Sequence, residues 1–330
     1  MAVYTHLSAE RMSDLIANYD VGALVSAKGI AEGVSNSNWL VETTGQDGSG
    51  ARFILTMYER RITLKDLPFF LDLLDHLAEK GCPVPRTIHD RNGAAFRMVY
   101  DKAVALIEFL PGLSVDRPSA EQARSAGKAL AGMHHASQDF AGTRTNDLGL
   151  QGVSELFEKC SGRLAEIDPD LPQITARHMP AIKAAWPDDL PKAIAHTDLF
   201  PDNVLVEGDQ VNALIDFYFA AREAMAYDLA VTHLAWSFEP GGGAFRRDVG
   251  DALIAGYQSV RTLSDKEREA LPTLAKAAAM RFIATRSYDW LFTPDDALVT
   301  RKDPMEFVQR LKFYDEAGHS VFALAEAGGT

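Results

Sequence analysis

The residues best suited to chemistry lie together in AHTDLFPDNVLVEGDQVNALIDFYFA, residues 195–220. His196, Asp198 and Asn203 stand there in the order H-x-D-x-x-x-x-N, and Asp216 follows in the apolar context Ile-Asp-Phe. A carboxylate can orient a hydroxyl group or accept its proton. Amide and carboxylate oxygens are hard ligands of the kind that Mg²⁺ prefers. The segment therefore predicts a magnesium site beside a base.

The residues between Asn203 and Asp216 predict how these side chains meet. Two short runs with strand-forming residues, 203–206 and 211–215, flank the turn EGDQ. A hairpin that closes about the last two residues of this turn places Asn203 directly opposite Asp216, with Cβ atoms about 5 Å apart. Asp198 is close enough in sequence to reach the same place. The alternative is that these residues only cap turns and end a strand, but an unpaired carboxylate behind an apolar run is costly to bury.

The same order of residues occurs in the catalytic loop and the later metal-binding Asp of protein kinases. The three-residue pattern alone would arise by chance on the order of 1% of the time in such a chain. Phosphoryl transfer has a loose transition state, so its catalysis depends on neutralising the phosphates and placing the acceptor hydroxyl in line. The motif thus favours a phosphotransferase.

Longer stretches resemble a known family. HTDLFPDN, IDFYFA and AYDLA are similar to the aminoglycoside-phosphotransferase-like superfamily. Further stretches resemble its homoserine kinase branch: GVSNSNWLVET, FILTMYE, PFFLDLLDHLAEKGCPVPR, IEFLPG, WPDDLPKAIAHTDLFPDNV, AMAYDLAV, ALPTLAKAAAMRFIATRSYDW and RKDPMEFVQRLKF. The resemblance spans roughly residues 25–315. It implies transfer of the ATP γ-phosphate to the hydroxyl of L-homoserine, with Mg²⁺ as cofactor, on the way to threonine.

The resemblance also implies roles for single residues of the catalytic segment. Asp198 would be the catalytic base, and Asn203 and Asp216 would hold Mg²⁺. His196 and Asp228 would support the catalytic loop, with a helix N-cap as the alternative role for Asp228.

The nucleotide is expected on the first hundred residues and the segment that follows them. The resemblance implies the binding residues Gly33, Ser35, Asn36, Ser37, Asn38, Glu108 and Leu110. The turn 33–38 would cover the phosphates, and the segment 108–110 would be a hinge that offers backbone groups to adenine. Taken alone, the turn is weak evidence, because most Gly/Ser/Asn turns only join strands. The segment 108–110 could equally be a plain linker.

One position departs from the kinase pattern. Kinases usually carry a Lys on the third strand, where it holds the α- and β-phosphates. Thr56 stands at the expected place here, and Arg60, Arg61 or Lys65 are the candidates to reach in instead. The homoserine kinase branch shares a third strand without Lys, so Thr56 does not by itself predict an inactive protein.

The acceptor site is expected on the helix 280–290. Homoserine carries a carboxylate and an ammonium group, so its site should offer a guanidinium and an acid. Arg281, Arg286 and Asp289 are the candidates, and Tyr218 would line the pocket. The alternatives are an exposed i,i+3 ion pair between Arg286 and Asp289 that contributes under about 1 kcal/mol, and a core position for Tyr218.

Two further features are less informative. His134 and His135 end the run LAGMHH, where we expect structural roles, with a polar contact beneath the catalytic loop as the alternative. The segment 240–243, PGGG, is predicted as a surface loop, with a lid as the alternative.

The pattern of elements predicts an α+β, protein-kinase-like fold with two lobes. Residues 1–109 are expected as a β-rich nucleotide-binding lobe, and 110–330 as a mainly helical lobe for catalysis and acceptor binding. The strands expected in the first lobe are 22–30, 38–44, 52–58, 94–100 and 104–109, around one helix within 64–81. The second lobe should hold helices at 120–135 and 152–165, a strand-like segment at 193–216, and two helices divided by Pro272 within 265–290.

Composition limits the classes of partner. The 330-residue chain has a net charge of −13, which works against binding nucleic acid. Cys82 and Cys160 lack metal-type spacing and are expected as reduced thiols, with a single disulfide as the alternative. No signal-peptide pattern and no apolar run near the ~18 residues of a membrane span is present. We therefore expect a cytoplasmic protein without a membrane partner; homo-oligomerisation stays open.

Three functions remain after these steps. The first is the kinase of the homoserine branch. The second is a relative that acts on another amino alcohol or an aminoglycoside, which would need an acidic pocket for a polycation rather than Arg281 and Arg286. The third is a nucleotide-binding protein without turnover, which only Thr56 supports.

Overall fold

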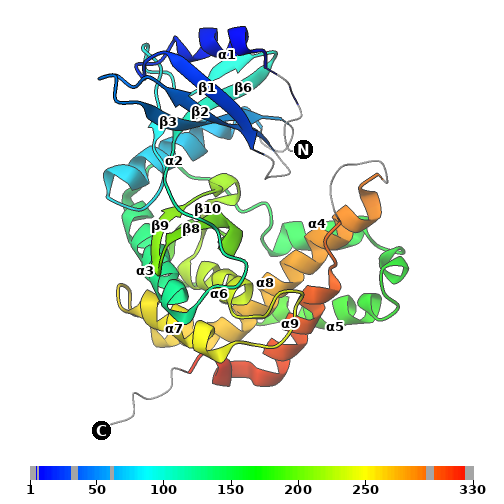
Figure 1. Cartoon of the computed structure of the whole chain (residues 1–330). Helices are drawn as coiled ribbons and strands as arrows, with labels where there is room; N and C mark the ends of the chain where they lie inside the picture. The colour runs from blue at the N-terminus through cyan, green and yellow to red at the C-terminus, as the bar shows by residue number, and fades with distance from the viewer. Residues whose placement is uncertain (1–4, 6, 31–35, 60–62, 295–300, 324–330) are drawn as a thin grey trace. The chain divides into compact units, whose positions relative to one another are not determined.

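The computed structural model describes residue 5 and residues 7–30, 36–59, 63–294 and 301–323. The chain forms two compact units, Met1–Pro111 and Gly112–Thr330. The first holds an antiparallel sheet and the second is mainly helical, so the expected α+β composition is confirmed (Figure 1). In the described part of the chain, no helix has the length and apolarity that a membrane crossing requires.

The first unit is built on a six-stranded antiparallel sheet. Its strands are β1 (Leu24–Ile30), β2 (Asn36–Thr43), β3 (Ala51–Tyr58), β4 (Thr87–Ile88), β5 (Arg97–Val99) and β6 (Lys102–Glu108). The strand order is β1-β2-β3-β6-β4, and β5 pairs with β6. Two helices, α1 (Ala9–Ile16) and α2 (Leu67–Glu79), lie on opposite faces of this sheet (Figure 1). The predicted strands are confirmed within a few residues.

Alternation along the central strands separates the two faces of the sheet. One face packs on α1 through a core that includes Met12, Leu15, Ile16, Trp39, Val41, Leu55, Met57, Val104 and Leu106. Because side chains alternate along a strand, Asn36, Asn38 and Thr56 belong to the other face. Register agrees, since Thr56 pairs with Asn38 on β2 and with Ala105 on β6.

Residues at its two ends explain where α2 begins and ends. Asp66 stands at the N-cap position and Pro68 lies in the first turn, where its missing N–H costs nothing. The helix ends at Glu79, and Gly81 follows with a φ of 79°. Only glycine adopts that left-handed conformation without strain, so Gly81 explains where the helix stops.

Within its described residues, the second unit packs seven α-helices and two small sheets. The helices are α3 (Ala120–Ala136), α4 (Leu150–Lys159), α5 (Leu171–Ala184), α6 (Met225–Trp236), α7 (Arg247–Gln258), α8 (Asp265–Phe292) and α9 (Met305–Ala317). The strands β7 (Lys192–Ala195) and β10 (Ala221–Ala224) pair with each other, as do β8 (Val204–Glu207) and β9 (Gln210–Leu214). Cys82 and Cys160 are free thiols, as expected.

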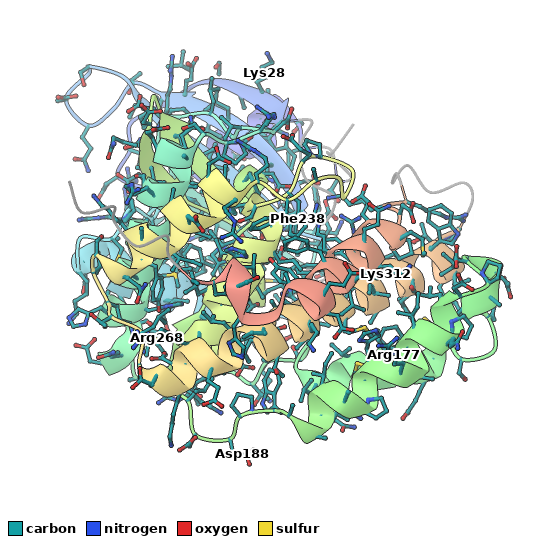
Figure 2. The ribbon with its side chains drawn as sticks, turned by 90° about the horizontal axis from the view of Figure 1, so that it is seen from below. Lys28, Arg177, Asp188, Phe238, Arg268 and Lys312 are labelled. Atoms are coloured by element: carbon teal, nitrogen blue, oxygen red, sulfur yellow. The ribbon has the colours of Figure 1, made fainter. Side chains whose placement is uncertain are left out.

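Helix α8 corrects one prediction. We expected Pro272 to divide two helices, but a single 28-residue helix runs from Asp265 to Phe292 through this proline. The proline removes one backbone hydrogen bond, and its own burial, with that of its neighbours Leu271 and Leu274, holds the helix together across it. Helix α8 contacts α4, α5, α6 and α9. In Figure 2, α8 can be found by Arg268 near its start, α9 by Lys312 and α5 by Arg177.

Helices α3 and α7 approach so closely that their backbones touch (Figure 1). A Cβ at Gly127 of α3 would lie 2.1 Å from the carbonyl oxygen of Leu253 on α7. A Cβ at Gly256 of α7 would lie 2.0 Å from the carbonyl oxygen of Arg124 on α3. Both glycines are therefore required by packing, and the pair sets the distance between the two helices.

We predict that Gly127→Ala lowers the free energy of unfolding by about 1–3 kcal/mol, because overpacking forces the backbones apart. Gly132→Ala on the same helix is the matched control, since a Cβ there meets nothing within 4 Å. That change should be neutral or stabilising by up to about 1 kcal/mol through helix propensity. Urea unfolding of both variants measures the difference, and equal effects would contradict the packing argument.

Candidate functional site

The catalytic segment lies between β7 and β10 in the second unit. His196, Thr197 and Asp198 directly follow β7, Asn203 ends a short 3₁₀ turn, and Asp216 follows β9. All of these residues lie in loops at strand ends, which is where side chains are free of the sheet ladder and can converge.

The hairpin register differs from the prediction. Glu207 pairs with Gln210, which leaves a two-residue turn at Gly208 and Asp209, and an irregularity follows before Leu205. Gly208 has a φ of 59°, which suits a two-residue turn placed one residue earlier than predicted. As a result, the backbone N–H of Ile215, rather than Asp216, meets Asn203, donating to its carbonyl oxygen at 3.0 Å. The predicted pairing of Asn203 with Asp216 is therefore wrong, and Asp216 comes one residue beyond it.

Two residues of the segment have left-handed backbones. Thr197 has a φ of 62° and Asp216 a φ of 64°, where a side chain other than glycine costs about 1–2 kcal/mol. The left-handed conformation is less favourable for Thr197 than for Asp216, because the side chain of Thr197 is β-branched. Such positions persist only where the surroundings fix them, and they concentrate at functional sites.

Asp228 on α6 fixes the first of these positions. Its carboxylate is fully buried, and it accepts hydrogen bonds from the backbone N–H groups of His196 and Thr197, both at 2.7 Å. Burial would raise the pKa of Asp228, but the hydrogen bond from His134 and the nearby histidines outweigh it and hold the pKa below its usual value. The carboxylate is therefore ionised and anchors two consecutive peptide groups of the loop.

His134 on α3 connects this carboxylate to α7 and α8. Its Nε2 lies 2.9 Å from Asp228 Oδ2, and its Nδ1 lies 2.9 Å from the hydroxyl of Tyr257. Since the ionised carboxylate can only accept, Nε2 carries the proton, and in the neutral ring Nδ1 accepts from the Tyr257 hydroxyl. Arg261 donates to that hydroxyl oxygen at 3.4 Å and pairs with Glu267 at 2.7 Å.

Only one residue of this chain of hydrogen bonds was considered in the sequence analysis. The polar contact of His134 beneath the catalytic loop was the alternative reading of LAGMHH, whereas Tyr257, Arg261 and Glu267 were missed. They lie in ordinary helical sequence, and only the packing of α3 against α7 brings them to His134.

His196 links the loop to the strand that leads to Asp216. Its buried ring lies 2.9 Å from the carbonyl oxygen of Ile215 through Nε2, and its Nδ1 accepts from the backbone N–H of Asp198 at 3.3 Å. Burial lowers the pKa of His196, so the ring is neutral with its proton on Nε2. One imidazole thus sets the spacing between the Asp198 and Asp216 loops.

Asp198 is the best-placed base of the site. Its side chain is 20% exposed, and one oxygen lies 3.4 Å from the guanidinium of Arg281. Burial raises the pKa of Asp198, and the charge of Arg281 only partly offsets this. A carboxylate that is largely desolvated yet still accessible is suited to accept or orient a hydroxyl proton.

Asn203 and Asp216 suit a hard cation. The side-chain amide of Asn203 donates from Nδ2 to the carbonyl oxygen of Asp198 at 2.8 Å, which turns its Oδ1 the other way. Asp216 is exposed at the end of β9. One amide oxygen and one carboxylate form the sparse protein ligand set that Mg²⁺ uses when phosphate oxygens and water complete its shell.

Arg281 on α8 lies against the catalytic loop. Its side chain is 1% exposed, its Nη1 donates to the carbonyl oxygen of Thr197, and its guanidinium stacks 4.6 Å from the ring centre of Phe282. Most of this residue is therefore occupied by the loop itself. Its assignment to the acceptor carboxylate stays a prediction.

The other acceptor candidates lie in the turn after Asp216 and on α8. Tyr218 is half-buried in the 3₁₀ turn directly after Asp216, and Asp289 lies on α8. Arg286, also on α8, forms an ion pair of 2.6 Å with Glu306 on α9. Glu306 was missed because nothing in its local sequence marks it, and only the contact of α8 with α9 brings it to Arg286.

The predicted nucleotide residues lie in the first unit. Gly33 and Ser35 fall outside the described residues. Asn36 and Asn38 belong to the face of the sheet that carries Thr56, whereas the Ser37 side chain is on the α1 face, where its hydroxyl donates to Glu59 at 2.6 Å. Ser37 can therefore offer a nucleotide only its backbone.

The two hinge candidates, Glu108 and Leu110, differ in whether their backbone groups are already hydrogen-bonded. Glu108 exchanges backbone and side-chain hydrogen bonds with the backbone of Arg86. The N–H and C=O groups of Leu110 have no hydrogen-bond partner within the described ranges of the chain. Backbone groups of this kind can pair with an adenine edge.

Comparisons with known proteins cover most of the chain. Residues 26–263 match the model of the Phosphotransferase enzyme family. A homoserine kinase from Granulibacter bethesdensis is 44% identical over 95% of this chain and 97% of its own length, and one from Azorhizobium caulinodans is 46% identical over 95% and 96%. In fold, an amicoumacin kinase structure matches with a TM-score of 0.70 at 13% identity, over 95% of both chains. A spectinomycin phosphotransferase matches with a TM-score of 0.66 at 14% identity, over 97% of this chain and 99% of its own.

We predict that Tyr257→Phe lowers both stability and turnover. Loss of the hydroxyl leaves His134 Nδ1 buried without a donor, which should cost about 1–3 kcal/mol of unfolding free energy. The loosened His134 should also lower kcat several-fold with little change in KM, because small displacements of a catalytic loop are felt in the rate.

Tyr314→Phe is the matched control. The Tyr314 hydroxyl lies 2.7 Å from Nδ1 of His233, a buried histidine on α6. The ring of His233 packs against Phe322 instead of the catalytic loop. This variant should lose similar stability in thermal unfolding but keep its kcat. Equal kcat values for the two variants would contradict a role of Tyr257 in positioning the loop.

Proposed function

We propose a function from the premise that the chain belongs to the phosphotransferase enzyme family, whose model it matches over residues 26–263. The chain is a homoserine kinase, an ATP-dependent phosphotransferase that moves the γ-phosphate of ATP to the hydroxyl of L-homoserine and gives O-phospho-L-homoserine. The observation that carries this conclusion is the 44–46% identity to homoserine kinases along about 95% of the chain.

Asp198 orients the acceptor hydroxyl and takes its proton. The Asp228 carboxylate and His196 fix the backbone on either side of this base, so the carboxylate points in a set direction before substrate arrives. Its raised pKa makes it a stronger base than an exposed Asp. Arg281 keeps the carboxylate in place at 3.4 Å.

Asn203 and Asp216 hold Mg²⁺ in this proposal. When bound, the metal neutralises charge on the phosphates of ATP and orients them. What the chain supplies is two oxygen ligands on loops that His196 keeps at a fixed spacing, through its bond to the carbonyl oxygen of Ile215.

The first unit binds the nucleotide in this proposal. Leu110 offers its backbone groups to adenine, and the face of the sheet with Asn36, Asn38 and Thr56 faces the phosphates. Lys102 does not replace the absent third-strand lysine, because it lies on the α1 face in an ion pair with Glu59. Of the three cations considered for that role, Lys65 lies within the described residues and is exposed.

The charge of the acceptor candidates favours an anionic substrate. Arg281 and Arg286 both lie on α8 near the base, and a polycationic aminoglycoside would be repelled by them. Homoserine carries a carboxylate that a guanidinium can bind in two places.

The proposal predicts that Mg-ATP is hydrolysed to ADP faster when L-homoserine is added, and much less so with L-serine, choline or an aminoglycoside panel. No stimulation by homoserine would overturn the assigned function. Asp198→Asn should lower kcat about 10²-fold or more, the usual effect of losing a positioned base. Asp202→Asn, an exposed carboxylate of the same loop, should stay within a few-fold of the wild type.

The metal assignment predicts a changed requirement for Mg²⁺. Asp216→Ala should raise the Mg²⁺ concentration for half-maximal rate about tenfold or more, since one of two protein ligands is lost. Asp209→Asn, an exposed carboxylate in the turn of the same hairpin, should leave that concentration unchanged. Steady-state rates over a Mg²⁺ titration after chelator treatment give the comparison; parallel curves for both variants would remove Asp216 from the metal site.

A further inference from the structure

The ion pair between Arg286 and Glu306 is partly shielded and joins α8, the helix that also carries Arg281, to α9. Arg286 Nη1 is 2.6 Å from Glu306 Oε2 and 2.8 Å from the carbonyl oxygen of Asp303. The side chains are only 15% and 28% exposed. Both recorded bonds use Nη1, so among the described residues the Nη2 and Nε edge of the guanidinium keeps its donors.

Aromatic rings connect this pair to the catalytic loop. The Arg286 guanidinium lies 4.4 Å from the ring centre of Phe307, which stacks on Phe282 at 4.8 Å. Phe282 in turn meets Phe200, two residues after Asp198, at 4.9 Å. The ion pair and the base therefore stand on one continuous apolar floor within the second unit.

The length of α8 gives the scale of the gap between them. Arg281 contacts Asp198, and Arg286 lies five residues further along the helix, about 7.5 Å along its axis and about 140° around it. In homoserine the hydroxyl oxygen and the carboxylate carbon are separated by up to about 5 Å, from ordinary bond lengths. The guanidinium groups of Arg281 and Arg286 lie on the stacked rings of Phe282 and Phe307, so a small acceptor with its hydroxyl at Asp198 can direct its head group along these rings toward Arg286.

The backbone of Glu306 is held firmly from the other side. A Cβ at Gly242 would lie 2.8 Å from both Cα and the carbonyl oxygen of Glu306, so the glycine-rich loop packs directly on the start of α9. The loop is closed by Glu239, whose N–H donates to the carbonyl oxygen of Ala244 at 3.0 Å. The segment 240–243 is thus a support for Glu306, which keeps its carboxylate in place beside Arg286.

We propose that Arg286 and Glu306 together bind the zwitterionic head group of the acceptor. Arg286 takes the α-carboxylate through Nη2 and Nε, and Glu306 takes the α-ammonium. The assignment rests on the proposed function, because it names the head-group site of that same acceptor.

Charge complementarity explains why a pair is needed. A zwitterion that binds beside an ion pair leaves each of the four charges with an opposite neighbour. An acceptor that lacks one of its two charges leaves either Arg286 or Glu306 unmatched in a partly desolvated place, which is unfavourable. The pair therefore selects α-amino acids over simple amino alcohols and over hydroxy acids.

Three acceptors with the same chain length test this selection. L-homoserine carries both charges, 4-hydroxybutanoate lacks the ammonium, and 3-aminopropan-1-ol lacks the carboxylate. For the wild type, kcat/KM for homoserine should exceed that for either truncated acceptor by about 10- to 100-fold, the range for a lost hydrogen bond to a charged group.

Two variants should remove one preference each. Glu306→Gln should bring the homoserine to 4-hydroxybutanoate ratio close to one and keep the preference over 3-aminopropan-1-ol. Arg286→Met should do the reverse. Arg268→Met, at an exposed ion pair with Asp265 on the same helix, is the control and should keep both ratios. KM for ATP reports that each variant is folded, and Glu306→Asp, which keeps the charge, serves if Glu306→Gln does not fold: it should lower only the ratio to 4-hydroxybutanoate.

The outcomes separate this inference from the function on which it rests. A wild type that homoserine does not stimulate would overturn the proposed function. A wild type that phosphorylates homoserine, with ratios that stay the same in the Glu306 and Arg286 variants, would overturn the head-group site alone. The head-group site would be established if each variant lost only its own preference, over 4-hydroxybutanoate for Glu306→Gln and over 3-aminopropan-1-ol for Arg286→Met. A general loss of packing would instead lower all three kcat/KM values together.

Discussion

The buried carboxylate of Asp228 is the interaction on which the rest of the site depends. An ionised group without solvent is costly unless it is fully hydrogen-bonded, and Asp228 meets this condition with three donors: two peptide N–H groups of the catalytic loop and the ring of His134. The same bonds hold Thr197 in a left-handed conformation that its β-branched side chain disfavours. The position of Asp198, one residue later, follows from that strained turn.

The sequence was sufficient to predict the order of the parts and their chemistry. The spacing of His196, Asp198, Asn203 and Asp216 indicated a phosphotransferase, and the strands of the first unit follow from alternating patterns and turn residues. The hairpin register was wrong because the two-residue turn lies one residue earlier than predicted, at Gly208 and Asp209, and an irregularity shifts one strand. The proposal of a shared metal site does not depend on this register, since Asn203 and Asp216 lie in loops beyond the ladder, where a shift of one residue still leaves both residues at the same end of the hairpin.

Contacts between elements distant in the chain could not be predicted from local pattern. Tyr257 reaches His134 only because Gly127 and Gly256 let α3 and α7 touch. Arg286 was predicted as an acceptor-binding residue, with an ion pair to Asp289 on the same helix as the alternative, but its ion pair is with Glu306 on α9. Helical spacing can suggest which residues share a face; it carries no information on which other helix that face meets.

A cluster of arginines in an acidic chain brings these points together. Arg281, Arg286 and Arg310 lie on the rings of Phe282 and Phe307, with centroid distances of 4.4–4.6 Å. A planar guanidinium can stack on a ring and still donate at its edge, which a lysine ammonium cannot do. Burial, with the charge of Arg286 adding to it, lowers the pKa of Arg310 to about 10, so it remains charged near neutral pH. The net charge of −13 therefore says little about this part of the second unit, where three guanidinium groups gather on α8 and α9. Such local positive charge favours the small zwitterionic acceptor that we propose.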